Sequence, residues 1–356
     1  ASGTTLTSAG NITLSAANGG MTTAGNLTLS APSSITMTGT MSGTGDISLS
    51  ASNGITLNNS ISTSSGLLSI NANSSALTLG SGVTLSSTNA LTLAASSTTS
   101  SGDLTLTSSA STINVNNALV SAGAVTMTAS TGLTLSNSTL TGSGNISLQG
   151  GSSLSLASGT TITSSAGNIT LGASGGSITA NGALTLSSNG SITVSNALTA
   201  TGAATLNANS GITLGNSFTA NGAVALDADL DNNGTGDFTI SSGTLSTTSN
   251  ALTLTANDLI LTGSLNSGTG STTINVSDGG SLGIGFSSGF GMNLTTTEQA
   301  NIIGTGDLSL VNGSITISAS NSLSASGKLT IGQSGGTITG QGALTLSGAK
   351  GLAINS

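Results

Sequence analysis

Residues 183–226 read ALTLSSNGSITVSNALTATG, AATLNANSGITLGNSFTANG and AVAL, which are three copies of one pattern beginning at Ala183, Ala203 and Ala223. Each copy contains short runs in which Ile, Leu or Val alternates with Thr or Ser. A period of two is typical of a β-strand that buries one face. The Gly, Asn and Ser residues between the runs favour tight corners. A repeat of about twenty residues is the length of one solenoid coil.

The same aliphatic–polar–aliphatic run recurs along the chain, usually after Gly and an Asn, Asp or Ala. Copies include Asn11-Ile12-Thr13-Leu14, Asn26-Leu27-Thr28-Leu29, Asp46-Ile47-Ser48-Leu49, Asp103-Leu104-Thr105-Leu106, Asn145-Ile146-Ser147-Leu148, Asn168-Ile169-Thr170-Leu171 and Asp307-Leu308-Ser309-Leu310. The sequence therefore predicts an all-β protein, a parallel β-helix (β-solenoid) with coils of about 20 residues. We expect one continuous solenoid over residues 1–356, with about sixteen to eighteen coils.

The composition limits the classes of function. Only 3% of the 356 residues are charged, and the chain has two cationic residues (Lys328 and Lys350), ten acidic residues, no His and no Cys. Hydrophobic residues make up 35% and are regularly spaced, which separates the chain from flexible Gly/Ser linkers. A net charge of −8 disfavours nucleic-acid binding. No apolar run approaches the roughly twenty residues of a membrane span.

Catalysis is not expected. Solenoid lyases and hydrolases need acid–base pairs, cations that stabilise developing charge, or a metal ion. Asp46, Asp103 and Asp307 each follow Gly at the start of a run, a corner position where a carboxylate can accept hydrogen bonds from nearby backbone amides. We therefore predict no catalytic residues and no cofactor. Calcium is the one candidate ion.

That candidate rests on the acidic run of residues 227–237, which we expect to form a loop excursion. It contains Asp227, Asp229, Asp231 and Asp237 together with Asn and Gly. Carboxylate and amide oxygens on a sharp turn suit Ca²⁺. The match to an EF-hand loop is incomplete, because the Gly comes late and no Glu closes the site. The alternative is a polar loop between coils whose carboxylates are solvated.

A second irregular stretch, residues 279–306, is predicted to be an insertion between coils. It contains Phe286 and Phe290 among Gly residues, followed by Thr295 to Ile303, where we expect a short helical turn with a Thr cap and Glu298 in its first turn. The two Phe side chains are a candidate contact surface for a receptor. The alternative is that they pack beneath the excursion and fill a gap in the coil stack.

The chain resembles the filamentous-haemagglutinin-like exoproteins, large secreted adhesins often exported by two-partner secretion. The resemblance rests on the Gly-Asn-Ile-Thr-Leu blocks, on the acidic run ahead of Phe238-Thr239-Ile240, and on Thr297-Glu298-Gln299-Ala300-Asn301-Ile302. It implies a right-handed β-helix, export to the cell surface or medium, and a role in adhesion, biofilm or surface architecture. It supplies no catalytic residues. No signal peptide begins at Ala1, so we interpret the chain as a mature or internal portion of a longer protein.

Two functional hypotheses follow. In the first, the chain is an extracellular structural protein, a rod, stalk or filament segment that associates end to end or continues into a longer chain. In the second, it is an adhesin module that binds a host or cell-surface glycan or protein along one solenoid face. Open strand edges at the ends of an uncapped solenoid favour the first hypothesis.

Overall fold

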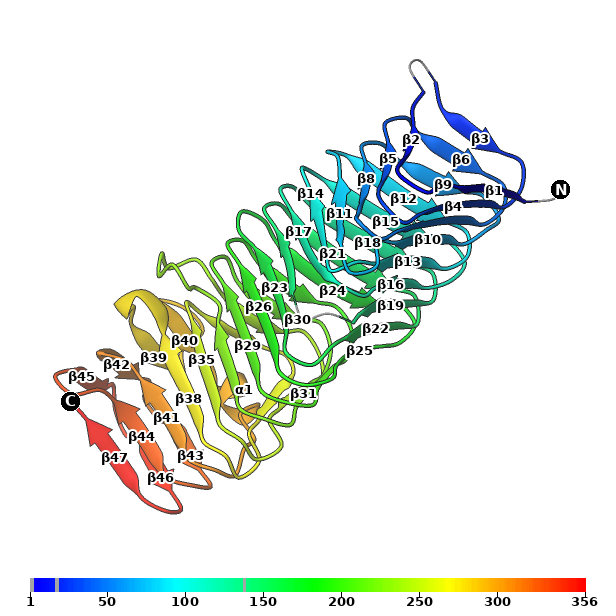
Figure 1. The fold of residues 1–356 in the computed structure, drawn as a ribbon. Helices are drawn as coiled ribbons and strands as arrows, with labels where there is room; N and C mark the ends of the chain where they lie inside the picture. Colours follow the sequence, from blue (N-terminus) through cyan, green and yellow to red (C-terminus); the bar gives the residue numbers. More distant parts are fainter. Residues whose placement is uncertain (1–2, 17–18, 137–138) are drawn as a thin grey trace. The chain divides into compact units, whose positions relative to one another are not determined.

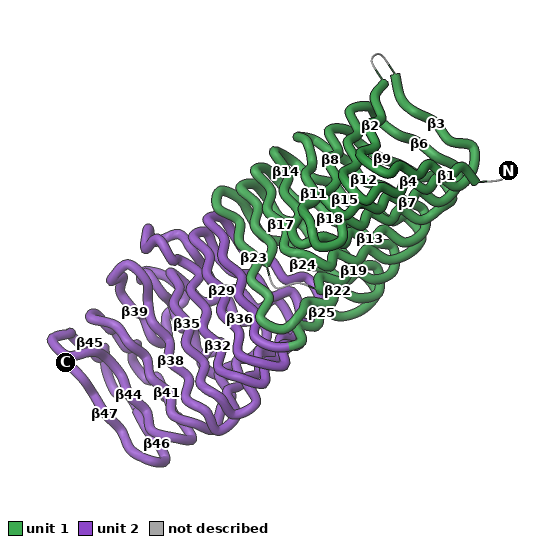
Figure 2. The backbone as a smooth tube through the Cα atoms, viewed as in Figure 1, with its two compact units in different colours: residues 1–181 green, residues 182–356 purple. Residues whose placement is uncertain are grey.

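The computed structural model describes residues 3–16, 19–136 and 139–356. It is an all-β parallel β-solenoid with about 17 turns of about 21 residues, which confirms the predicted fold class and coil length. The handedness stays a prediction. The chain divides into two compact units, Ala1–Asn181 and Gly182–Ser356, shown in different colours in Figure 2.

The first unit consists of three parallel sheets, and each coil contributes one strand to each sheet (Figure 1). Sheet A1 contains β1 (Thr4–Thr7), β4 (Leu27–Ala31), β7 (Ile47–Ala51), β10 (Leu68–Asn71), β13 (Leu91–Ala94), β16 (Ile113–Val115), β19 (Gly132–Leu135), β22 (Ser153–Leu156) and β25 (Ser177–Ala180). Sheet B1 contains β2 (Ile12–Leu14), β5 (Ile35–Met37), β8 (Ile55–Leu57), β11 (Ala76–Leu79), β14 (Ser97–Ser100), β17 (Ala118–Ser121), β20 (Thr139–Gly142) and β23 (Thr160–Ser164). Sheet C1 contains β3 (Met21–Thr23), β6 (Met41–Gly43), β9 (Ile61–Thr63), β12 (Val83–Ser87), β15 (Leu104–Ser108), β18 (Val125–Ala129), β21 (Ile146–Gly150) and β24 (Ile169–Ala173).

The second unit begins with the same three-sheet arrangement and changes after β38. Sheet A2 contains β28 (Leu198–Ala200), β31 (Phe218–Ala220), β34 (Thr244–Ser246) and β37 (Ser264–Asn266). Sheet B2 contains β26 (Leu184–Ser188), β29 (Ala204–Ala208), β32 (Val224–Asp227), β35 (Leu252–Ala256), β38 (Thr272–Val276), β41 (Leu308–Val311), β44 (Leu329–Gly332) and β47 (Leu352–Asn355). Sheet C2 contains β27 (Ile192–Val194), β30 (Ile212–Leu214), β33 (Phe238–Ile240) and β36 (Leu259–Leu261).

Two smaller sheets and two short helical segments complete this unit. Sheet D contains, in spatial order, β40 (Met292–Leu294), β39 (Leu282–Ile284), β42 (Ser314–Ile317) and β45 (Thr337–Gly340), and sheet E contains β43 (Ser322–Ala325) and β46 (Thr345–Gly348). The helical segments are the 3₁₀ turn η1 (Ser277–Gly279) and the helix α1 (Thr296–Ala300).

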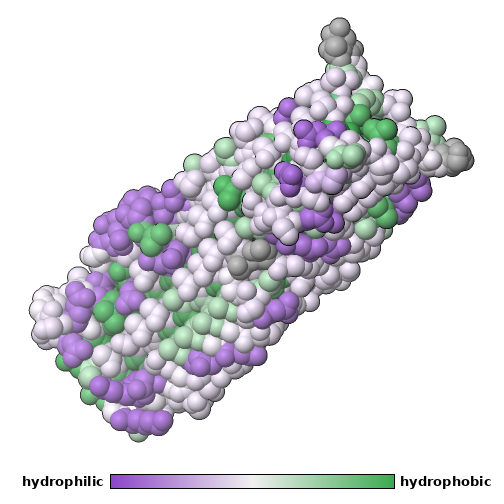
Figure 3. Space-filling view, viewed as in Figure 1, coloured by the Kyte–Doolittle hydropathy of each residue, from purple (hydrophilic) through white to green (hydrophobic). Residues whose placement is uncertain are grey.

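Alternation within each strand builds the core. In β8, Ile55 and Leu57 are buried while Thr56 between them stays partly exposed, and most strands repeat this pattern. The three copies quoted at the outset stack in register, because Leu184 pairs with Ala204 and Ala204 pairs with Val224. Like residues therefore lie above like residues, and small aliphatic side chains are enough to fill the interior. The face shown in Figure 3 is mostly of intermediate hydropathy, as outward Thr and Ser dictate.

The Gly-Asn/Asp corners hold successive coils together. Asp46 Oδ1 accepts a hydrogen bond from the Leu67 amide at 3.0 Å, and Asp103 Oδ1 accepts one from Ala124 at 2.8 Å. Further pairs of this type join Asn26 to Asp46, Asn145 to Asn168, and Asp307 to Lys328. A Cβ on the corner residue Gly66 would lie 2.2 Å from the Gly45 carbonyl carbon. Close stacking therefore requires Gly, and the expected carboxylate–amide bonds are confirmed at Asp46, Asp103 and Asp307.

The three-sheet pattern is interrupted within the second unit. Sheets A2 and C2 end at β37 and β36, whereas β38 pairs directly with β41 and continues sheet B2. The intervening residues form η1, β39, β40 and α1. Leu265 of β37 pairs with Ile302 through an isolated parallel bridge, so the segment after α1 covers the last strand of sheet A2.

Candidate functional site

The acidic run begins at Asp227, the last residue of β32, and ends just before β33, and its four carboxylates occupy different environments. Asp229 is fully buried, Asp227 and Asp237 are half-buried, and Asp231 is exposed. Burial is the largest influence on the Asp227 carboxyl and raises its pKa, with the nearby Asp229 charge adding to the rise and the Asp229 amide opposing it.

Asp229 is held by hydrogen bonds from the protein itself. Its Oδ1 accepts from the Asn233 amide at 3.2 Å, and its Oδ2 accepts from the Gly234 amide at 3.0 Å and from the Ser277 hydroxyl at 2.6 Å. Its own amide donates to Asp227 Oδ1 at 3.2 Å. These bonds compensate the buried charge and close the loop onto η1. The geometry gives Asp229 a structural role.

The other two carboxylates point to separate partners. Asp231 Oδ2 accepts from the Asn233 side-chain amide at 2.9 Å, and Asp237 Oδ1 accepts from the Asn257 side-chain amide at 3.0 Å. Across residues 3–16, 19–136 and 139–356, no three His, Cys, Asp or Glu side chains gather as a metal site would require. Calcium binding by Asp227, Asp229, Asp231 and Asp237 stays a prediction that this geometry does not support.

Asp258, which was not among the predicted site residues, lies between β35 and β36. Its Oδ1 accepts hydrogen bonds from the Asn293 amide at 2.8 Å and the Leu259 amide at 2.9 Å. Burial raises the pKa of this carboxyl, opposed by those hydrogen bonds and reinforced by the charge of Asp237. No motif marks this residue, because its partner Asn293 lies 35 residues further along the chain.

Phe286 and Phe290 pack against each other. Their ring centroids are 4.8 Å apart with the planes tilted by 50°, and both side chains are half-buried. A Cβ on Gly283 would lie 2.2 Å from Cδ2 of Phe290, so this ring covers the backbone of β39. The arrangement supports the packing alternative, while a part of each ring remains open to solvent. A receptor contact here stays a prediction.

The expected helical turn is confirmed as α1, with Thr295 as its N-cap. The Thr295 hydroxyl accepts from the Glu298 amide at 3.2 Å, and Glu298 Oε2 accepts from the Thr295 amide at 2.9 Å, which completes a capping box. Glu298 Oε1 also accepts from the Leu261 amide at 3.4 Å, and Asn301 Nδ2 donates to the Leu261 carbonyl at 2.8 Å. The helix therefore satisfies backbone groups at the end of sheet C2.

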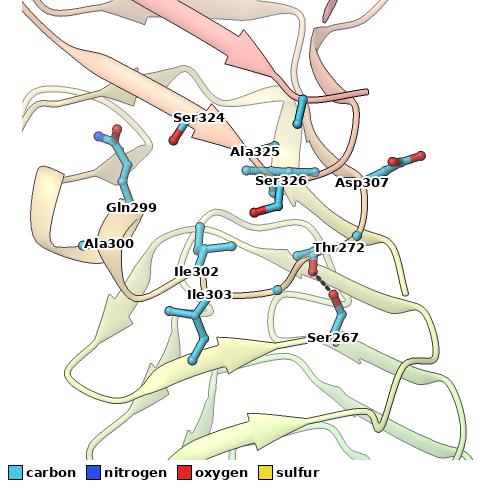
Figure 4. Close-up of a pocket in the computed structure, with 14 residues that line it drawn as sticks. Ser267, Thr272, Gln299, Ala300, Ile302, Ile303, Asp307, Ser324, Ala325 and Ser326 are labelled. Carbon is cyan, nitrogen blue, oxygen red and sulfur yellow. Dashed lines mark hydrogen bonds between the residues drawn. The ribbon is translucent and has the colours of Figure 1, made fainter. Parts of the chain in front are cut away.

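A hollow of about 470 Å³ opens beside this helix (Figure 4). Gln299, Ala300, Ile302 and Ile303 lie on one side, and residues 324–326 lie on the other. A second hollow of about 310 Å³ shares Gln299, Ala300 and Ser324 with the first and reaches Asn321. No sequence motif marks these hollows, although they lie beside the predicted insertion of residues 279–306.

Comparison with known proteins finds similarity to one family model and no named relative. A family model described as repeats of unknown function (DUF5649) matches residues 1–71 and 173–227. Neither a curated protein nor a solved structure matches the chain. The second matched segment contains the in-register copies of residues 183–226 and ends at Asp227, where the acidic run begins. The described residues include no helix of the length and apolarity needed to cross a membrane.

Proposed function

We propose that the chain is a structural segment of a secreted or cell-surface fibre in which its end coils pair with further coils, those of a second copy or those of a longer chain. The observation that carries this proposal is the exposure of core positions at the last strand. Leu352 and Ile354 are 45% and 54% exposed, although their ladder partners Leu329 and Ile331 are fully buried. Strand β47 thus presents an apolar edge with unpaired backbone groups, a surface on which another strand can add.

The first strand presents a matching surface. Leu6 of β1 is 44% exposed, whereas its partner Leu29 in β4 is 1% exposed. A hollow of about 340 Å³ lined by Leu6, Leu14 and Met21 opens at this coil. Head-to-tail contact would extend the ladders and bury the exposed side chains of Leu6, Leu352 and Ile354. Export and a haemagglutinin-like role are parts of the proposal supported by the sequence resemblance, and no catalytic activity is included.

Sedimentation velocity of the 356-residue chain over a concentration series, with negative-stain microscopy, tests the proposal. We expect the mass to rise with concentration and chains to join at their ends. Ile354→Lys places a charge on the open edge and should return the protein to single-chain mass. Ala353→Lys, on the outward face of the same strand, is the matched control and should preserve association. Discrete particles of single-chain mass at every concentration would rule out pairing between copies through these edges.

A second candidate, contact with a glycan, is favoured by the solvent-open part of the Phe286–Phe290 pair. Aromatic rings provide flat apolar surface that suits ligand contact. Glycan-array binding that disappears in both Phe286→Ala and Phe290→Ala, while the melting midpoint is retained, would support it. Array binding unchanged by both substitutions would remove these rings as the contact.

A further inference from the structure

Strand β43 is paired on one edge only. It belongs to the two-stranded sheet E, in which the Thr345 amide donates to the Asn321 carbonyl at 2.9 Å and the Ala349 amide donates to the Ala325 carbonyl at 3.1 Å. Alternate residues of a parallel strand direct their backbone groups to opposite edges. Because Asn321 and Ala325 bond towards β46, the backbone N–H and C=O groups of Ser322 and Ser324 face the other edge.

That edge faces the hollows beside α1. The segment opposite β43 is Asn301 to Ile303, and it pairs with β37 along one side of its backbone. The Leu265 amide donates to the Asn301 carbonyl at 2.8 Å, and the Ile303 amide donates to the Leu265 carbonyl at 2.9 Å. Figure 4 shows Ile302 and Ile303 across the hollow from Ser324, Ala325 and Ser326, with Gln299 at one side. We call this space the slot, bounded by Gln299, Ala300, Ile302, Ile303, Ser324 and Ala325.

The lining of the slot is almost uncharged. Asp307 is the one ionisable residue among those lining the two hollows, and its Oδ1 already accepts from the Lys328 amide at 2.8 Å. Ile303 keeps 48% of its surface exposed. Asn321, which lines the smaller hollow, is only 6% exposed, and its Oδ1 accepts no hydrogen bond from the described residues. A buried amide oxygen without a donor is costly, but this atom has almost no surface open to the hollow, so we assign it no ligand contact.

We propose that the slot binds an extended, uncharged peptide segment of a partner protein, which adds as a strand to the open edge of β43. Strand addition takes its affinity from main-chain hydrogen bonds and its selectivity from side-chain pockets. The open backbone groups of Ser322 and Ser324 provide the main-chain hydrogen bonds. The aliphatic surface of Ile302 and Ile303 provides the side-chain contacts. A saccharide fits less well because no aromatic ring lines either hollow. The inference does not depend on end-to-end association.

The probe is a fluorescein-labelled acetyl-GSITLSG-amide peptide, titrated into the full chain and followed by fluorescence anisotropy. Its control is the same peptide with alternate backbone amides N-methylated, which keeps the side chains and removes donors. We expect saturable binding of the probe and a loss of about tenfold or more with the N-methylated peptide, as one or two unmade hydrogen bonds dictate. No saturable binding, or equal binding of both peptides, would overturn the proposal.

Protein variants locate the site. Ala300→Trp, at an exposed helix position lining both hollows, should fill the slot and weaken probe binding by about tenfold or more. Ser324→Pro removes the backbone N–H donor of residue 324 on the open edge of β43. Ser324→Ala keeps that backbone N–H and is the matched control. Far-UV circular dichroism and the melting midpoint establish that each variant folds. Unchanged probe binding by Ala300→Trp would contradict the proposal, as would binding of maltose in the slot without binding of the peptide.

Discussion

The hydroxyl of Ser277 donates a 2.6 Å hydrogen bond to Oδ2 of Asp229, although 48 residues separate the two along the chain. Asp229 is fully buried and Ser277 is 4% exposed, so this bond joins the acidic loop to η1 out of reach of solvent. The Asp278 amide lies 3.5 Å from Asn232 Oδ1 at the same junction. The loop is thereby attached to the start of the interruption.

Ser277→Ala should lower the free energy of unfolding by about 1.5–3 kcal/mol, the range for a hydrogen bond to a charged group. Denaturant titration measures the loss, with the exposed Ser287→Ala as its control. We expect the same loss in calcium and in a chelator, because Asp229 is held by protein donors. A calcium-dependent gain in stability that Asp229→Asn removes would instead support an ion in this loop.

Substitution of Phe218 tests the packing of the stacked core. It is fully buried in β31, between Leu198 and Leu245 of the neighbouring coils. Phe218→Ala should cost about 3–5 kcal/mol, because a thin core cannot collapse around the cavity. Thr219→Ala, one residue along and directed outward, should change the denaturation midpoint little. Equal effects of the two substitutions would show that the inward and outward faces are wrongly assigned.

Removal of the α1 capping box tests whether the helix protects the end of sheet C2. Thr295→Ala removes the cap and should cost about 1 kcal/mol. Because Glu298 and Asn301 bond to Leu261 and Leu265, hydrogen exchange at those two amides should accelerate. Thr297→Ala, exposed and outside the capping box, is the control. Unchanged protection of Leu261 and Leu265 in Thr295→Ala would mean that their amides are protected independently of the helix.

Asp258 should make stability depend on pH. Its pKa is raised in the folded state, so the folded chain binds the proton more tightly than the unfolded chain, where Asp titrates near 3.9. Stability is therefore greatest below the unfolded pKa and falls as pH rises through the folded one. Asp258→Asn retains an acceptor for the Leu259 and Asn293 amides without the charge.

Melting midpoints from about pH 4 to about pH 7 measure this effect. The melting midpoint of Asp258→Asn should fall less over that range than the midpoint of the parent protein. At neutral pH the midpoint of the variant should be no lower than that of the parent. The exposed Asp278→Asn controls for the loss of one negative charge. A parent profile that rises across the range while the variant stays flat would contradict the assigned direction.

Local pattern was enough to predict the coils. The Asn168-Ile169-Thr170-Leu171 run became β24, and the twenty-residue spacing of Ala183, Ala203 and Ala223 became an in-register ladder. Period-two alternation determines which side chains turn inward, and the corner Gly residues determine where coils can stack. These are short-range properties, and a single sequence contains them.

The site could be predicted only in part. The capping signature of Thr295 and Glu298 is local and was found. The pairing of Ile302 with Leu265 and the bond from Ser277 to Asp229 join positions far apart in sequence, and no spacing rule encodes them. The open edge of β43 follows from which strands pair, so the slot became visible only with the three-dimensional arrangement.

The interruption also has a mechanical consequence. Sheet B2 continues from β26 to β47, whereas sheets A2 and C2 stop at β37 and β36. A tension applied along the stacked coils of the second unit would be shared by three ladders before the interruption and carried by one unbroken ladder through it. Extension would therefore begin at residues 277–306, with the coils on either side keeping their pairing. A segment that interrupts a repeat can in this way act as the compliant link in a stack of coils.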